Sequence, residues 1–67
     1  MDKRLLQRFA NPKQFTDELL SMKANALSGM IHREQDYEKL PALNQLLRGI
    51  LDEQTSRTFQ RLRGKSL

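Results

Sequence analysis

The stretch DYEKLPALNQLLRGIL, residues 36–51, places a proline between a charged segment and the most leucine-dense part of the chain. Proline fixes its own φ, lacks a backbone N–H and disfavours helical angles in the residue before it, so Pro41 predicts a boundary between two helices. Proline is well tolerated in a first helical turn, and the second helix is therefore expected over about 41–63. Residues 34–41 are open to two interpretations, as a loop or as an extension of the preceding helix.

Before this boundary, apolar residues repeat at the spacing of a helix. One row consists of Phe15, Leu19, Met22, Ala26 and Met30, and the row beside it consists of Leu20, Ala24, Leu27 and Ile31. Together the rows predict a helix over about 12–36, with an apolar face broad enough to contact two neighbours. Asn11 as a side-chain N-cap, followed by Pro12 at the first helical position, is expected to start this helix.

Shorter signals lie at both ends of the chain. Leu5, Leu6 and Phe9 predict a short helix over about 2–9, and Gly64 is expected to end the last helix, which leaves a basic tail at 64–67. The sequence thus predicts a single small domain over 1–67 with an all-α fold. Its short N-terminal helix is followed by a helical hairpin.

The apolar residues exceed what a two-helix hairpin can cover. The face expected to bind a partner consists of Leu43, Leu46, Leu47, Ile50 and Leu51, and it is continued with a sideways drift by Thr55, Thr58, Phe59 and Leu62. A chain of this length buries only about 60% of the surface that its unfolded form exposes. There is no cysteine, and His32 alone cannot hold a metal. We therefore expect dimerisation, or docking on a partner protein, to complete the bundle.

Basic residues gather at the C-terminal end. The chain has 12 Lys and Arg against eight Asp and Glu, a formal charge of +4. The expected basic contact consists of Arg57, Arg61, Arg63 and Lys65, a segment without any carboxylate. Such a set complements the C-terminal end of a helix dipole or an acidic protein partner, and it equally suits a phosphate backbone.

The sequence favours binding over catalysis. It shows no pairing of nucleophile and base, no metal-ligand spacing and no phosphate-binding loop, so we expect neither an enzyme nor a cofactor or small-molecule substrate. No apolar run or secretory signal is present, which indicates a cytoplasmic protein without membrane contact. The hypothesis is a small non-catalytic regulator that binds a transcription or replication protein, a setting taken by analogy from size and composition. The alternative is a small DNA-binding transcriptional regulator with a C-terminal basic helix.

Overall fold

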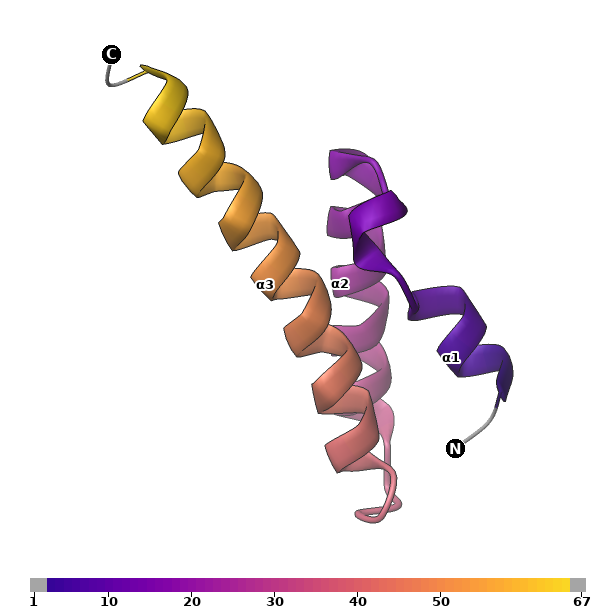
Figure 1. Cartoon of the computed structure of the whole chain (residues 1–67). Helices are drawn as coiled ribbons and strands as arrows, with labels where there is room; N and C mark the ends of the chain where they lie inside the picture. The colour runs from indigo at the N-terminus through magenta and orange to yellow at the C-terminus, as the bar shows by residue number, and fades with distance from the viewer. Residues whose placement is uncertain (1–2, 66–67) are drawn as a thin grey trace.

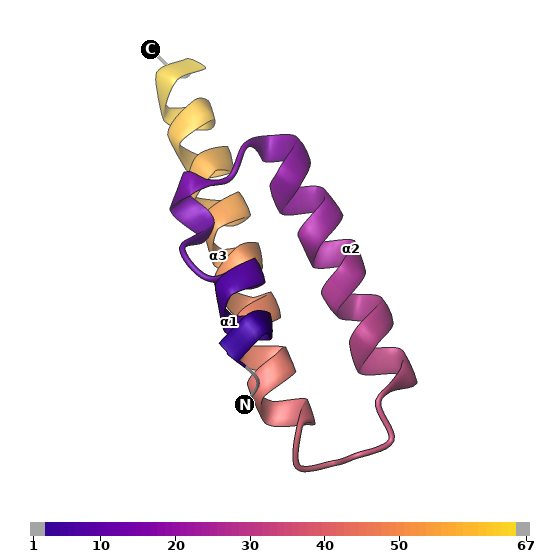
Figure 2. The same cartoon turned by 90° about the vertical axis from the view of Figure 1, so that its right-hand side faces the viewer.

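A computed structural model describes residues 3–65, and within that range the chain is all-α, as predicted. Its elements are α1 (Lys3–Phe9), the 3-10 turn η1 (Pro12–Gln14), α2 (Asp17–Arg33) and α3 (Leu40–Lys65). Figure 1 shows α2 and α3 as an antiparallel hairpin, with α1 to one side. In the second view, α1 lies in front of the first half of α3, and the two helices are in contact (Figure 2). The molecule measures 48 × 19 × 16 Å, and its length is set mainly by α3.

The predicted helix over 12–36 is wrong at its start. Asn11 has φ 57° and ψ 58°, which is left-handed, and its side chain caps nothing. A helix N-cap needs extended angles, which Thr16 supplies with φ −67° and ψ 164°. The Thr16 hydroxyl accepts a hydrogen bond of 3.2 Å from the Leu19 backbone N–H. The helix therefore begins at Asp17, where two carboxylates in the first turn favour its dipole.

The segment before Pro41 is a connection. α2 ends at Arg33, and residues 34–39 lie outside the helices. Carboxylates organise this turn: Glu34 accepts a 3.0 Å hydrogen bond from the Asp36 backbone N–H, and Asp36 accepts one of 3.0 Å from that of Glu38. Local side-chain bonds of this kind compete with continued helix. α3 then starts at Leu40 with Pro41 in its first turn, as the proline predicts.

The other end of α3 departs from the prediction. The helix continues through Gly64 to Lys65, so Gly64 is not its terminator. Gly64 has no positive φ, and a glycine with helical angles costs a helix only about 1 kcal/mol relative to alanine. The structure thus replaces the first two residues of the expected basic tail with helix, and residues 66–67 lie outside the described range.

One small core joins the helices. Its buried members are Phe9, Leu20, Leu27, Leu43 and Ile50, with partly buried apolar side chains packed around them. On α2 the second predicted row faces this core, whereas Leu19 and Met22 of the first row are 40% and 66% exposed. The broad α2 face is therefore only partly used. The α1 side is further held by the Lys23 ammonium, which lies 5.3 Å from the Phe9 ring centre and 5.0 Å from that of Phe15.

Candidate interaction surface

The predicted partner-binding leucines belong mainly to the hairpin itself. Leu43 and Ile50 are buried, and Leu46 and Leu47 are partly buried against the same core. Leu51 differs, because 45% of it is exposed. Four of the five predicted contact residues are thus engaged within the chain, and Leu51 is the member with substantial surface to offer.

A different apolar surface lies on α3. We call it the α3 stripe; its residues are Leu51, Thr55, Thr58, Phe59 and Leu62, which line one shallow groove together with Gln54. At 100° per residue they fall within one side of the helix. Phe59 is 62% exposed and Leu62 57% exposed. Large apolar side chains grouped at this exposure are what partner-binding surfaces present.

The stripe is exposed because it lies on a side of α3 that α2 does not cover. Gln54 and Arg57, on the neighbouring side, reach Ser21 and Asp17 of α2, so α2 runs beside most of the stripe without covering it. α2 begins at Asp17, and the last turns of α3 extend past that point without α2 beside them (Figure 1). The sequence predicted that Phe59 and Leu62 continue the face of the leucines after Pro41 with a sideways drift. In the structure this drift rotates them away from the direction of the buried Ile50.

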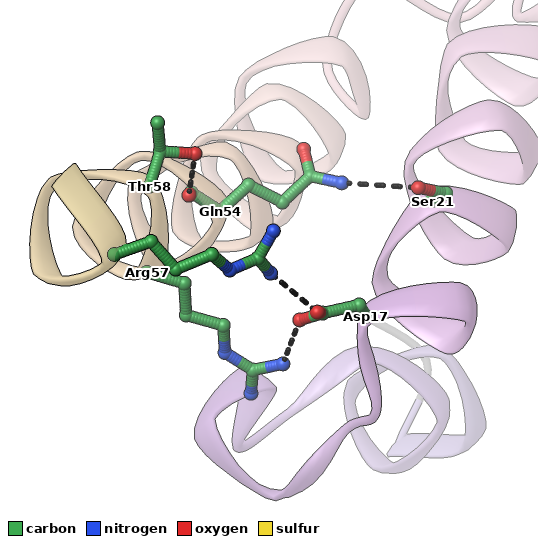
Figure 3. A pocket seen from close by; sticks show the side chains of 6 residues that line it. Asp17, Ser21, Gln54, Arg57 and Thr58 are labelled. Atoms are coloured by element: carbon green, nitrogen blue, oxygen red, sulfur yellow. Dashed lines mark hydrogen bonds and ion pairs between the residues drawn. The ribbon is translucent and has the colours of Figure 1, made fainter. Parts of the chain in front are cut away.

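Two of the predicted basic residues, Arg57 and Arg61, bind a carboxylate at the start of α2. Arg57 Nη1 lies 2.8 Å from Asp17 Oδ1, and Arg61 Nη2 donates to Asp17 Oδ2 (Figure 3). Arg57 Nη2 also donates to the backbone oxygens of Lys13, at 3.2 Å, and Pro12, at 3.4 Å. This cluster joins α3 to the start of α2 and to η1. Arg57 and Arg61 therefore have a structural role that the sequence did not reveal.

A second polar link lies one turn further along the hairpin. Gln54 donates a side-chain hydrogen bond of 3.4 Å to the Ser21 hydroxyl (Figure 3). Gln54 also lines the groove of the α3 stripe, so this edge of the stripe adjoins α2. The two links connect the first turns of α2 with the second half of α3.

The contact between Asp17 and Arg57 favours the charged form of each side chain. The hydrogen bond from Arg57 holds the pKa of Asp17 below its ordinary value of 3.8, against the effect of desolvation. The same bond raises the pKa of Arg57. The Asp17 side chain is 60% exposed, so solvent screens the attraction and the pair stabilises the hairpin modestly.

The remaining two basic residues lie beyond this cluster. Arg63 is exposed on the last turns of α3. Lys65 is the last residue of that helix, and its side chain lies outside the part of the structure that is described. The structure thus separates the predicted basic set into a pair that binds Asp17 and a pair at the helix end.

Among residues 3–65, no helix combines the length and apolar character that a membrane crossing needs. The same residues contain no cluster of three or more metal-ligating side chains. Comparison of the chain with protein-family models, with curated proteins and with solved structures gives no match.

Proposed function

We propose that this protein is a small non-catalytic regulatory protein that acts by protein–protein interaction. The observation that carries the proposal is the α3 stripe, where Leu51, Phe59 and Leu62 leave about half or more of their surface exposed. Burying such side chains against another chain is favourable by roughly 25 cal/mol per Å² of apolar surface. A helix presented beyond its hairpin is also a common form of recognition element.

The small size of the core also supports the proposal. Only five residues of the described range are buried hydrophobics, and a two-helix hairpin leaves one side of each helix without a neighbour. A further chain seated on the α3 stripe would complete a bundle. Either a second copy or a different protein can fill this position. By analogy with other small basic helical proteins, the regulated process is transcription or replication.

Direct DNA binding is the weaker alternative. Arg57 and Arg61 would have to leave Asp17 in order to contact phosphate, and the carboxylate would then repel the same phosphate. An acidic protein partner faces the same competition at these two side chains. The apolar stripe, however, has no role in phosphate contact, and this favours a protein partner.

A photo-reactive amino acid placed at position 59 tests the proposal in cells that produce the protein. The matched control places it at Gln60, the next residue, which lies on a different side of the same helix. We expect protease-sensitive, nuclease-resistant adducts from position 59 and few from position 60. Adducts made mainly with nucleic acid, or equal yields from both positions, would overturn the proposal.

A further inference from the structure

The geometry points to a second copy of this chain as the occupant of the α3 stripe, paired antiparallel about a twofold axis that passes between Ser56 and Arg57. This inference rests on the proposed function and names the partner at the same surface. Symmetric pairing of one surface with itself is the commonest route to a soluble oligomer. It requires that the surface be self-complementary.

The apolar positions meet this requirement. With the axis between Ser56 and Arg57, Leu51 of one copy lies opposite Leu62 of the second copy. Thr55 of one copy lies opposite Thr58 of the other. Leu51, Thr55, Thr58 and Leu62 have the alternating four- and three-residue spacing of a helix-packing seam. The seam therefore pairs leucine with leucine at both ends and threonine with threonine in the middle.

The charges select the antiparallel direction. In the half of α3 after the axis, Arg57 and Arg61 bind Asp17, so Arg63 is the basic residue that adjoins the stripe. In the half before the axis, Glu53 lies 3.5 Å from Arg57, so Asp52 is the carboxylate that adjoins the stripe. Parallel pairing would set Arg63 beside Arg63 and Asp52 beside Asp52, which is unfavourable, whereas antiparallel pairing sets Arg63 of each copy towards Asp52 of the other.

One edge of the seam offers a specific ion pair. Asp52 is exposed and lies beside Leu51, on the side of the stripe away from Gln54 and therefore away from α2. In the antiparallel pair, Arg63 of the second copy falls on this same edge and nearly level with Asp52. The twofold axis repeats the contact, so two Asp52–Arg63 pairs flank the leucines.

The apolar area that the stripe can bury is small. Leu51, Phe59 and Leu62 leave roughly 300 Å² exposed per chain, taking about 200 Å² for each whole side chain. Stable complexes bury about 800 Å² per partner in total, and these three side chains supply less than half of that area, so we expect a weak dimer. Because area does not fix affinity, a dissociation constant on the order of 100 µM serves as the centre of the concentration range to be tested.

Sedimentation equilibrium of the purified full chain over a concentration range spanning this value tests the pairing. The expected result is a shift from monomer to dimer mass. Leu62→Asp should raise the dissociation constant about tenfold or more, whereas Gln60→Asp, which adds the same charge away from the stripe, should change it far less. Far-UV circular dichroism establishes that both variants keep their helices. Equal effects of the two variants would overturn the inference.

Cross-linking decides the direction of the pair. The chain has no cysteine, so Leu51→Cys and Leu62→Cys each provide a single thiol. With a short bifunctional thiol reagent, an equimolar mixture of the two variants should yield a cross-linked dimer, and each variant alone should yield little. Dimers formed efficiently by each variant alone would indicate parallel pairing and overturn the inference.

Charge reversal tests the ion pair separately, because association through apolar contacts alone would not make the dissociation constant depend on the signs of these two charges. Asp52→Arg and Arg63→Asp should each weaken the dimer, and the two together should recover most of the loss. Failure of the double variant to recover overturns the ion pair.

The two proposals fail in different ways. A monomer at every concentration would overturn the second-copy inference, and adducts from position 59 to a different polypeptide would still support the proposed function. Absence of both dimer and protein adducts would overturn both.

Discussion

Ile50 and Leu51 are neighbours that sequence periodicity assigns to one face, and the structure separates them. Ile50 has no exposed surface, whereas Leu51 is 45% exposed. Truncation of each to alanine removes the same number of carbon atoms from the same turn of α3. Any difference in the free energy of unfolding therefore reports burial, with helix position held constant.

The expected magnitudes follow from that burial. Ile50→Ala removes three buried carbons at about 0.8 kcal/mol each and leaves a cavity, for a total of about 3–4 kcal/mol. Leu51→Ala loses roughly half of the transfer contribution and leaves no enclosed cavity, for about 1 kcal/mol. A domain of this length has a free energy of unfolding of about 3–10 kcal/mol, so Ile50→Ala should remove a large part of it.

Urea unfolding followed by far-UV circular dichroism measures both variants. The protein is kept at low micromolar concentration, below the range expected for association, so that Leu51 is compared in the monomer. Equal denaturant slopes for the two variants and the wild-type chain would show that the midpoints report stability. A loss from Leu51→Ala as large as that from Ile50→Ala would refute the assigned burial, and so would a loss below about 1 kcal/mol from Ile50→Ala.

Three further predictions concern the cap of α2, its ion pair with α3 and one exposed residue of the stripe. Thr16→Ala should lower the free energy of unfolding by about 1 kcal/mol, because it removes the hydroxyl that caps α2, and Thr16→Ser should keep most of it; equal losses in urea unfolding would contradict this. The pKa of Asp17 is lowered by Arg57, so the stability that this carboxylate contributes is present above its ordinary pKa of 3.8 and is lost as the pH falls through its folded-state pKa. Asp17→Asn should therefore flatten the fall in the unfolding midpoint on acidification, and an unchanged pH profile would contradict the assignment. Leu62→Asp should leave the unfolding free energy of the monomer within about 0.5 kcal/mol of the wild-type value, since this residue is 57% exposed; a larger loss in urea would place it in the monomer core.

The residues of the α3 stripe all lie on the apolar face that the sequence predicts or on its continuation, but the sequence does not show which part of that face is exposed. The leucines after Pro41 were predicted to bind a partner, and the structure packs four of the five into the core of the hairpin, because helical spacing reports which side chains share a face and not what covers that face. Spacing does not report which side of a helix its neighbour covers, and the position of α2 decides that Leu43 and Ile50 are covered while Phe59 and Leu62 are exposed. The arginine pair was assigned to an external contact because its partner, Asp17, lies 40 residues away from Arg57 along the chain.

The presence of the helices could be predicted from the sequence, since the apolar period, the proline at 41 and the shortage of glycine and proline act through local backbone energetics. Local competition also explains its main error, because both Asn11–Pro12 and Thr16–Asp17 are signals for a helix start, and only the backbone angles show which one is used. Three features could be seen only in the tertiary structure. They are the side of α3 that α2 covers, the contacts of Asp17 with Arg57 and Arg61, and the apolar side chains that remain at the surface. These outcomes depend on contacts between distant parts of the chain, and such contacts depend on the relative lengths and positions of whole helices.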